Sequence, residues 1–505
     1  MSQTNLYAVL RAGFSADLSA VAIETPSRTY AFNDIDEGSA RVAAYLSSLK
    51  LPEGARVAVQ VEKSPEALML YLGTLRAGLV YLPLNTAYRE SEVAYFLGDA
   101  EPAVVVCSGK NEAWVAPLAA RQPGTTLLTL EEDGSGSLAQ AIASFAPTFD
   151  TVACSPDALA VILYTSGTTG RSKGAMLSHR NMIANAQVLH GYWGWRRDDV
   201  LLHMLPIFHV HGLFVAAHGA LLAGARMIWL PKFDLEQALH YLPKSTVMMG
   251  VPTFYVRLLS DERFTRELCR SMRLFISGSA PLLTDTFQSF QARTGHTILE
   301  RYGMSETVML TSNPYLAEDG PRLGGTVGRP LPGVDVRVVD DNLQVVADAQ
   351  IGHIQVRGEN VFSGYWRMPE KTKEEFTPDG WFRTGDMGCW NEQGYLVIVG
   401  RSKDLIISGG FNIYPKEIET LIDDMPGVSE SAVVGVPHDD FGEAVVAIVV
   451  AKQGAVLSAD GIQATLKAGI ANFKVPKKVH VVNELPRNTM GKVQKNMLRE
   501  QFKTL

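Results

Sequence analysis

Short runs rich in valine and isoleucine alternate with longer amphipathic stretches from the N-terminal region to about Asn313. The runs occupy residues 56–62, 103–107, 159–167, 245–252, 274–282 and 296–303. A short apolar run bounded by turn residues is typical of a buried strand, and helix-length amphipathic segments between such runs are typical of parallel sheets. We therefore expect an α/β fold here, with helix-covered sheet layers and a helix over residues 284–293.

The pattern changes after Gly324. The stretches VDVRVVD (334–340), GHIQVRG (352–358) and GYLVIVG (394–400) alternate polar and apolar residues and are separated by glycine and aspartate turns. Since long helical periods are missing between them, we expect a small antiparallel or barrel-like subdomain at about 324–400. Residues 1–400 would form one large N-terminal domain.

Charge and glycine concentrate in GRSKDLIISGG, and residues 401–404, around Lys403, are the predicted hinge. The stretch PKEIETLID beyond it has helical spacing, SAVVGVP and AVVAIVVAK indicate paired strands, and GIQATLKAGI indicates another helix. Residues 405–505 are therefore predicted to form a small α+β domain of ordinary size.

Composition and charge narrow the function classes. The 505 residues include 46% hydrophobic and 20% charged residues, as in soluble globular proteins, and the net charge is −7. That charge argues against a general nucleic-acid binder, which must neutralise phosphates over a wide surface. The C-terminal end is nevertheless basic from Phe473 onward, which suits either a solvated surface or a small polyanionic ligand.

Cysteine usage and apolar segments indicate the cytoplasm. The four cysteines form no C-x-x-C pair, so neither a zinc site nor a disulfide framework is indicated. The N-terminal residues lack a basic leader followed by an apolar run. The most apolar region, Val200 to Leu230, contains four histidines, Pro206 and Arg226, which a bilayer would not accept readily. We expect no membrane association.

A loop rich in glycine, serine and threonine, YTSGTTGRSKGAMLSH (164–179), follows a predicted strand and precedes an amphipathic stretch. Its small residues could present backbone N–H groups to an anion, with Lys173 adding charge. It differs from the Walker pattern because Lys173 follows Gly170 by three residues and is followed by Gly174. On spacing alone, a flexible surface turn explains the loop as well as a phosphate site does.

Further motifs follow this loop in a fixed order: LPIFHVHG, ISGSAPL, RYGMSET, GWFRTGD, GRSKDLIISGG and PRNTMGKVQK. Together they resemble the adenylate-forming acyl-CoA synthetases, the superfamily that includes firefly luciferase and the adenylation domains of peptide synthetases. The resemblance covers nearly the whole chain. It implies a large N-terminal domain, a hinge and a mobile C-terminal domain, with ATP and coenzyme A as substrates and Mg²⁺ as the metal.

The resemblance implies two chemical steps. A carboxylate attacks the α-phosphate of ATP to give an acyl-adenylate and pyrophosphate, and a thiol then displaces AMP. Because negative charge gathers at the phosphates, fixed donors, a cation and a metal are needed. The ATP-binding residues that it implies are Thr165, Ser166, Gly167, Thr168, Thr169, Gly170 and Lys173 at the β- and γ-phosphates, Gly278, Ser279, Ala280 and Tyr302 at adenine, Ser305 at the α-phosphate, Asp386 and Arg401 at the ribose, and Gly303 and Met304 between Tyr302 and Ser305.

Three further roles come from the same resemblance. Glu306 is the implied Mg²⁺ ligand, a hard oxygen donor for a hard ion. Lys492 is the implied lysine that the small domain carries to the acid and the α-phosphate, and Ser408, Gly409 and Gly410 lie on the face used with coenzyme A. Acetylation of Lys492 by a lysine acetyltransferase is a further hypothesis, because it would remove the charge.

Two arginines point to the acid. Arg257 in GVPTFYVRLL and Arg301 in ILERYGMSE are unexpected beside an apolar acid, since a buried guanidinium needs an anionic partner. A second carboxylate on the substrate would supply one. These two stretches resemble those of malonyl-CoA synthetases, which implies malonate, with tolerance for methylmalonate, and His209 as the residue that positions the reacting carboxylate.

Other interpretations of these residues stay open. Arg257 could pair with Asp261 one helical turn on, Arg301 could serve an internal ion pair, and His209 and His211 could be core histidines. The alternative functions are a CoA ligase for another short-chain, aryl or fatty acid, a luciferase-like oxygenase and an enzyme that loads a carrier protein.

Overall fold

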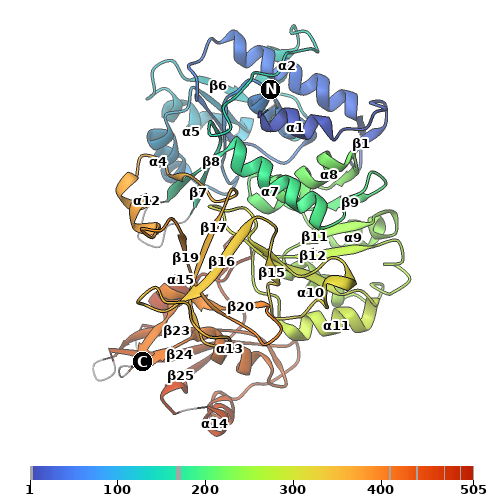
Figure 1. Ribbon diagram of the computed structural model, residues 1–505. Coiled ribbons are helices and arrows are strands. Elements are labelled where there is room, and N and C mark those ends of the chain that lie inside the picture. The colour runs from blue at the N-terminus through green and yellow to red at the C-terminus, as the bar shows by residue number, and fades with distance from the viewer. Residues whose placement is uncertain are drawn as a thin grey trace.

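The computed structural model describes residues 4–165, 172–408, 411–438, 442–470, 472–488 and 491–503. Two large sheets and their helices form the N-terminal region, and a smaller sheet with its own helices forms the C-terminal region, at the bottom of Figure 1. A four-stranded antiparallel sheet lies between them (Figure 1). The mixed α/β architecture predicted from the apolar runs is confirmed.

The seven-stranded sheet is parallel in its central strands and antiparallel at one edge, where β7, β8 and β18 pair. Its strand order is β18 (Gly364–Tyr365), β8 (Lys173–Ser178), β7 (Leu159–Thr165), β4 (Val80–Pro83), β3 (Arg56–Gln60), β5 (Val104–Cys107) and β6 (Thr126–Thr129). The helix α2 (Phe32–Ser48) precedes the first of these strands in the chain, and the helices that follow are α3 (Pro65–Arg76), α4 (Glu90–Ala100), α5 (Gly109–Ala119) and α6 (Ser137–Ile142).

The nine-stranded sheet has the order β15 (Arg329–Pro330), β14 (Thr311–Ser312), β13 (Ile298–Tyr302), β12 (Leu274–Ser277), β11 (Val247–Gly250), β9 (Val200–His203), β10 (Arg226–Trp229), β1 (Val21–Glu24) and β2 (Thr29–Ala31). Its helical segments are α7 (His179–Tyr192), the π-helix η1 (His211–Ala217), α8 (His218–Ala223), α9 (Leu235–Tyr241), η2 (Leu242–Lys244), α10 (Pro252–Leu259) and α11 (Thr284–Thr294). One hydrophobic core joins both large sheets, and α3, buried along almost its whole length, is part of it.

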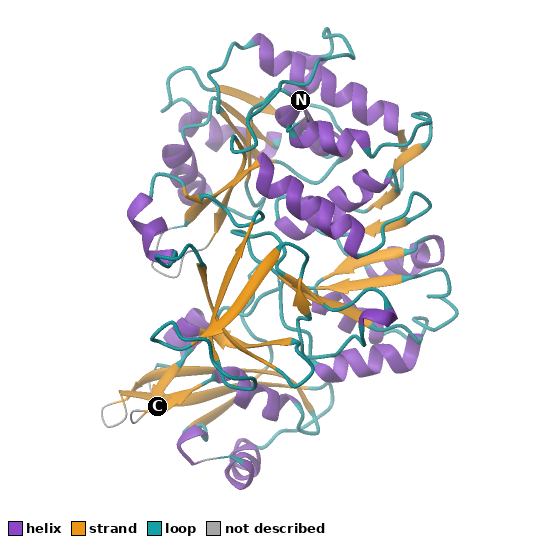
Figure 2. Ribbon diagram, viewed as in Figure 1, coloured by secondary structure: helices purple, strands orange, loops and turns teal. Residues whose placement is uncertain are grey.

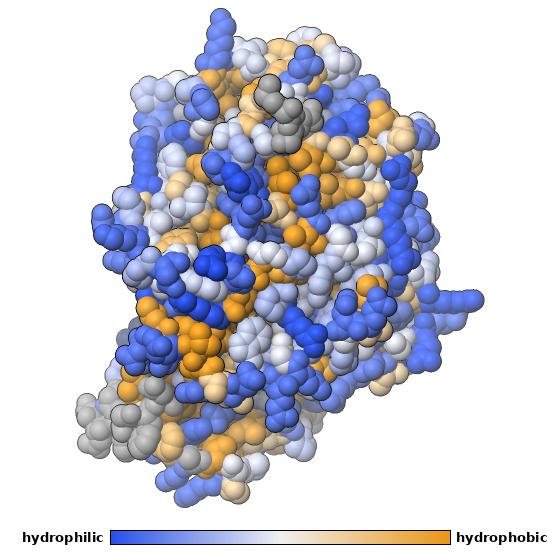
Figure 3. Space-filling model, in the orientation of Figure 1, coloured by the Kyte–Doolittle hydropathy of each residue, from blue (hydrophilic) through white to orange (hydrophobic). Residues whose placement is uncertain are grey.

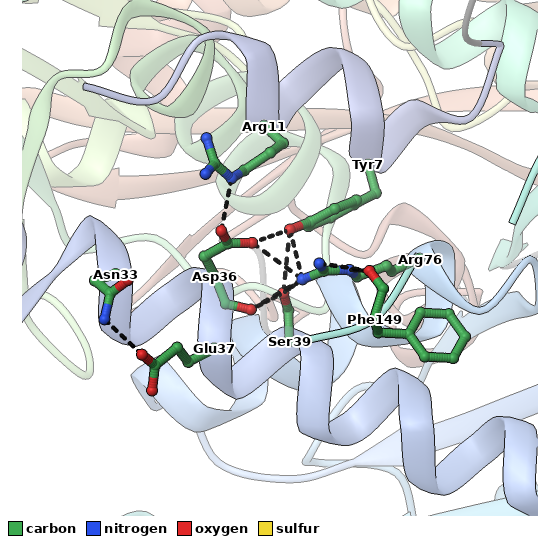
Figure 4. A network of polar contacts seen from close by, with 8 residues as sticks. All are labelled: Tyr7, Arg11, Asn33, Asp36, Glu37, Ser39, Arg76 and Phe149. Carbon is green, nitrogen blue, oxygen red and sulfur yellow. Dashed lines mark hydrogen bonds and ion pairs between the residues drawn. The ribbon is translucent and has the colours of Figure 1, made fainter. Parts of the chain in front are cut away.

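The first helix, α1 (Leu6–Ala12), is fixed to this core by a polar network around Asp36 (Figure 4). The Asp36 carboxylate accepts hydrogen bonds from Tyr7 Oη at 2.5 Å, Arg11 Nε at 2.9 Å and Arg76 Nη1 at 3.0 Å. Because Arg76 also donates to the carbonyl of Phe149 at 2.7 Å, the network connects α1, α2, α3 and the chain leading to β7. A partly buried carboxylate with several charge-assisted donors is well compensated.

The predicted antiparallel subdomain is confirmed as a sheet of β16 (Val334–Val339), β17 (Gly352–Gly358), β19 (Phe382–Trp390) and β20 (Leu396–Arg401). It also contains α12 (Pro369–Glu375), a seven-residue helix between β18 and β19 that the alternating pattern did not indicate. In the register of β19 and β20, Asp386 is opposite Arg401. The strands therefore bring the two predicted ribose-binding residues together.

The C-terminal region is a five-stranded sheet with its own hydrophobic clusters (Figure 2). The two predicted paired strands and two predicted helices are confirmed, as β23, β24, α13 and α14. The elements are η4 (Ser402–Asp404), β21 (Ile406–Ser408), β22 (Phe411–Ile413), α13 (Pro415–Asp423), β23 (Val428–His438), β24 (Gly442–Ala451), α14 (Ala459–Gly469), η5 (Asn472–Lys474), β25 (Lys478–Val482) and α15 (Lys495–Gln501). Residues 402–404, in the predicted hinge, form a single 3-10 turn.

The surface is mainly polar. Charged and polar residues cover most of the face in Figure 3, and apolar residues lie in smaller areas between them. None of the helices in the described ranges has the length and apolar character that a bilayer span requires.

Candidate active site

The glycine-rich loop joins two antiparallel strands. Thr165 ends β7 and is opposite Lys173, the first residue of β8. The amphipathic stretch therefore begins with a strand, and the helix α7 starts only at His179. The predicted phosphate-binding residues Ser166, Gly167, Thr168, Thr169 and Gly170 lie outside the described residues.

Lys173 is buried beside an acidic helix. Its Nζ lies 3.3 Å from Oε1 of Glu375 in α12 and 4.1 Å from the centre of the Tyr365 ring. A buried ammonium is stabilised by an opposite charge and by the face of an aromatic ring. The side chain of Lys173 is therefore held in place by α12 and β18, and its role at the phosphates stays a prediction.

Glu306 is a buried carboxylate beside the same tyrosine. Its Oε1 accepts a hydrogen bond from Tyr365 Oη at 3.0 Å. Burial raises the pKa of Glu306, while this hydrogen bond and the charges of Arg401 and Lys173 act in the opposite direction. The described residues contain no group of three or more metal-ligating side chains. Glu306 fits an Mg²⁺ site in which a nucleotide supplies the remaining ligands, because Mg²⁺ is commonly bound by one or two carboxylates and substrate phosphates.

Tyr302 and the two predicted ribose-binding residues form one cluster. Asp386 accepts from Tyr302 Oη at 2.5 Å and from Arg401 Nε at 2.9 Å. Burial, together with the charge of Asp386, raises the pKa of Tyr302, so its phenol stays neutral. Gly303, Met304 and Ser305 are half-buried in the turn that follows Tyr302 and leads to Glu306.

The segment after β12, which holds three predicted adenine-binding residues, lies against Arg301 and His211. A Cβ atom at Gly278 would lie 2.3 Å from Cζ of Arg301, so only glycine leaves room for the guanidinium. Ser279 has a φ of 71°, in the left-handed region, and its Oγ lies 3.3 Å from Nδ1 of His211. Ala280 follows, half-buried.

Arg301 is a buried cation, and two of its three nitrogens lack a hydrogen-bond partner in the described part of the chain. Only 5% of its surface is exposed, and its Nε and Nη2 atoms have no hydrogen-bond partner among the described residues. Burial lowers the pKa of its guanidinium to about 9. The internal ion pair that would have explained a buried arginine is not found in the described part of the chain. An uncompensated buried charge is costly, which points to an anionic ligand.

Two histidines lie close to Arg301. The backbone N–H of His211 donates to Nδ1 of His209 at 3.3 Å, and Nε2 of the buried His211 has no partner in the described ranges. Burial and the charge of Arg301 lower the pKa of both rings, to about 4 for His209, where Lys492 contributes too. Both rings are therefore neutral near pH 7 and can donate or accept a hydrogen bond.

Arg257 is placed differently from Arg301. It is exposed on α10, with its guanidinium 5.9 Å from the centre of the Phe233 ring. Asp261, the alternative partner, instead pairs with Arg263 at 2.7 Å. Contacts between Arg257 and either Arg301 or His209 are absent among the described residues, and its role in acid binding stays a prediction.

Lys492 lies in a tight turn of the small domain that reaches the large domain. Its backbone N–H donates to Oδ1 of Asn488 at 2.9 Å, and a Cβ at the preceding Gly491 would lie 3.8 Å from Oγ1 of Thr253 in α10. The side chain of Lys492 is exposed, although neighbouring protein atoms desolvate its ammonium group. Burial and the charge of Arg401 lower the pKa of Lys492 to about 8, against the effect of Asp386.

Among the other predicted residues of the small domain, Lys403 lies close enough to Lys492 for its charge to reinforce burial in lowering the pKa of that lysine. Lys403 is exposed in η4, and partial burial lowers its pKa. Its neighbour Asp404 pairs with Arg499 at 2.5 Å. Ser408 is buried at the end of β21, opposite Phe411. Gly409 and Gly410 lie outside the described residues.

Family models match both parts of this arrangement. Residues 12–366 match the model described as AMP-binding enzyme, and residues 417–492 match the model described as AMP-binding enzyme C-terminal domain. The chain belongs to the AMP-binding enzyme family. The resemblance to adenylate-forming synthetases is thereby confirmed.

Members of this family with similar sequences include a malonate–CoA ligase of Arabidopsis thaliana, 33% identical over 99% of this chain and 89% of its own. Among solved structures, ATP-bound MatB from Rhodopseudomonas palustris is 54% identical, covers 99% of both chains and superposes with a TM-score of 0.96. Apo MatB from the same organism gives 0.86 at the same identity and coverage. The structure of this chain is thus more similar overall to that of the ATP-bound protein.

Sequence reasoning missed two residues of the candidate site in this chain. Tyr365 joins Glu306 to Lys173, and Glu375 is the counter-ion of Lys173. Neither lies in one of the motifs, and the contacts depend on α12 folding back over β8. The stretch GYWRMPEKTKEE around them carries no pattern that would have identified them.

Proposed function

We propose that this AMP-binding enzyme is an ATP-dependent acid:CoA ligase, that its acid is malonate and that the reaction passes through a malonyl-adenylate. Family membership and similarity to proteins named malonate–CoA ligase and MatB support ligation of an acid to coenzyme A. The observation that carries the choice of acid is the buried guanidinium of Arg301, whose Nε and Nη2 atoms find no hydrogen-bond partner among the residues that the structure describes.

A short dicarboxylate suits this pocket. One carboxylate would accept two parallel hydrogen bonds from Arg301, whose Nε and Nη2 lack other partners, and thereby compensate the buried charge. The other carboxylate would lie toward His209 and Lys492, since the charges of Arg301 and Lys492 both act on His209. A monocarboxylate can satisfy only one of these positions. Tolerance for methylmalonate is part of the proposal, because one added methyl group changes the volume and not the charges.

In the first step, an oxygen of the reacting carboxylate forms a bond to the α-phosphorus of ATP, and the bond to pyrophosphate breaks. Lys492 would stabilise the charge on the α-phosphate and hold the carboxylate, while Lys173 and the loop before it would bind the outer phosphates. Mg²⁺ held by Glu306 and the nucleotide would neutralise phosphate charge. Asp386 and Arg401 would bind the ribose, and Tyr302 would lie against adenine.

In the second step, the thiol of coenzyme A loses its proton and its sulfur bonds to the acyl carbon, while the bond from that carbon to the AMP oxygen breaks and AMP leaves. The small domain would rotate at residues 401–404, around Lys403, withdraw Lys492 and present Ser408, Gly409 and Gly410 to coenzyme A. Such a rotation lets one site complete two reactions by changing the residues that cover it.

The test is a panel of acids with ATP, Mg²⁺ and coenzyme A, with AMP release and the acyl-CoA product as readouts. Malonate should give the highest kcat/KM, and acetate, benzoate and a long-chain fatty acid should each be at least about tenfold poorer. Preference for a monocarboxylate would reject malonate while leaving the ligase assignment intact. Oxygen consumption that depends on the acyl-adenylate would support the luciferase-like alternative instead.

The matched variants are Arg301→Gly and Arg257→Gly. Arg301→Gly should reduce kcat/KM for malonate by about a hundredfold or more, because a buried charge pair is lost, and should spare ATP binding. Arg257→Gly measures whether the exposed arginine contributes. Unchanged use of malonate in Arg301→Gly would reject the pocket assignment.

A further inference from the structure

A second buried cation lies behind the histidines of the acid pocket. Lys63, between β3 and α3, reaches the ends of β9 and β10 in the other large sheet. Its Nζ lies 2.7 Å from the carbonyl oxygen of Leu230, 2.9 Å from that of His203 and 2.8 Å from Nδ1 of the His203 ring. Carboxyl ends of parallel strands are where sites form in open α/β sheets.

The hydrogen bonds of Lys63 and His203 fix their joint protonation. Nε2 of His203 lies 2.9 Å from the carbonyl oxygen of Gly212, and a carbonyl can only accept, so Nε2 carries a hydrogen. The carbonyls of His203 and Leu230 each take a hydrogen from Nζ, and one more hydrogen lies between Nζ and Nδ1. A neutral amine and a neutral imidazole supply one hydrogen too few. The pair therefore holds one extra proton and one positive charge.

The surroundings agree with a single charge. Nζ lies 4.5 Å from the centre of the Trp229 ring, whose face attracts a cation. Burial lowers the pKa of both groups, and the charge of Lys63 adds to the effect on His203, which disfavours a second extra proton. The ring of His203 also packs 4.5 Å from that of Trp229.

The pair is connected directly to the acid pocket. The carbonyl oxygen of Gly212 accepts a hydrogen bond from Nε2 of His203. Gly212 follows His211 at the start of the π-helix η1. The turn before it is tight, since a Cβ at Gly212 would lie 2.0 Å from the carbonyl oxygen of Pro206. Fixing Gly212 fixes the backbone on which His209 and His211 sit.

We infer that Lys63 and His203 form a positioning pair that shares one extra proton and holds the turn of His209 and His211 against Arg301. They act on the substrate only through that turn. The inference rests on the proposed function, because the turn lines the proposed acid pocket. The protonation of the pair, however, can be tested without any substrate.

The direct test is NMR of the full chain labelled with ¹⁵N-histidine, since the sequence has only 11 histidines. The spectrum of His203→Gln assigns the His203 signals. Nε2 of His203 should stay protonated from about pH 6 to about pH 9, without titration near the ordinary histidine pKa. An unprotonated Nε2, or ordinary titration, would overturn the shared proton whether or not malonate is the substrate.

The functional test is a double-mutant cycle with Lys63→Met, His203→Gln and the double variant. Each single variant should raise KM for malonate about tenfold and leave KM for ATP within about twofold, and the double variant should be little worse than the singles because the two residues act as one unit. Additive losses, or equal increases in both KM values, would overturn the positioning role. Lys110→Met is the matched control, because Lys110 is an exposed lysine that pairs with Glu62, next to Lys63.

Discussion

The guanidinium of Arg301 occupies the space that a side chain at position 278 would need, since a Cβ at Gly278 would lie 2.3 Å from Cζ of Arg301 and 2.4 Å from its Nη1. This contact predicts the result of Gly278→Ala. The new methyl group should push the flexible end of Arg301 away, which costs little stability but misplaces the charge. We expect kcat/KM for malonate to fall by about tenfold or more, as in other sites with a displaced positioning group.

The matched control is Gly98→Ala in α4, where a Cβ would have no neighbour within 4 Å. Alanine there should leave malonate kinetics unchanged and stabilise the chain by roughly 0.5–1 kcal/mol. Melting temperatures of both variants separate misfolding from a displaced arginine. If Gly278→Ala uses malonate as well as the unmodified chain does, the position of Arg301 is not required.

Removal of the Lys492 side chain should separate the two half-reactions. In Lys492→Ala, acid-dependent release of pyrophosphate from ATP should fall by about a hundredfold or more, because a cation beside the reacting phosphate is lost. Transfer of a preformed acyl-adenylate to coenzyme A should continue. Lys467→Ala, an exposed lysine of α14 in the same domain, is the control. Equal losses in both half-reactions would contradict the exchange of domain faces.

The pKa of Lys492 predicts an alkaline limit for adenylation. Burial and the charge of Arg401 lower the pKa of Lys492 to about 8. Its side chain is therefore largely charged at pH 7 and loses this charge as the pH rises through about 8. Pyrophosphate release should decline over that range. In Lys492→Arg any remaining activity should keep its level to higher pH, because guanidinium stays charged. The same alkaline limb in both proteins would assign it to another group.

The sequence predicts the strands of this fold where the strands are long. GHIQVRG coincides with β17, and the two apolar runs of the C-terminal domain pair as β23 and β24. Strands of two residues, such as β14, β15 and β18, form only because a neighbouring strand is brought to them. No local periodicity can indicate such strands.

The motifs located most site residues that the structure brings together, including Glu306, Asp386 and Arg401. They could not reveal Tyr365, because its hydrogen bond to Glu306 joins positions 59 residues apart and depends on the tertiary fold. Sequence also gave Arg257 and Arg301 equal weight. Only burial separates them, since Arg301 is enclosed and Arg257 is exposed.

Glu300, next to Arg301 on β13, predicts a pH dependence of stability. Its buried Oε1 accepts from the backbone N–H of Gly325 at 3.1 Å, and burial raises its pKa from 4.5 to about 8. A folded-state pKa above the unfolded value means that the folded state holds the proton more tightly. The stabilisation that Glu300 contributes should therefore be complete below about pH 4.5, and it should be lost as the pH rises toward about 8.

Glu300→Gln keeps the shape of the protonated acid and removes its titration. The variant should gain stability over the unmodified chain as the pH rises through this window, by on the order of 2 to 5 kcal/mol at the alkaline end. Melting temperatures of both proteins at about pH 5, 6.5 and 8.5 test this, because other groups titrate equally in both and cancel in the difference. Parallel melting curves would mean that Glu300 ionises in the folded state as readily as in the unfolded chain, and that water or a cation compensates its charge.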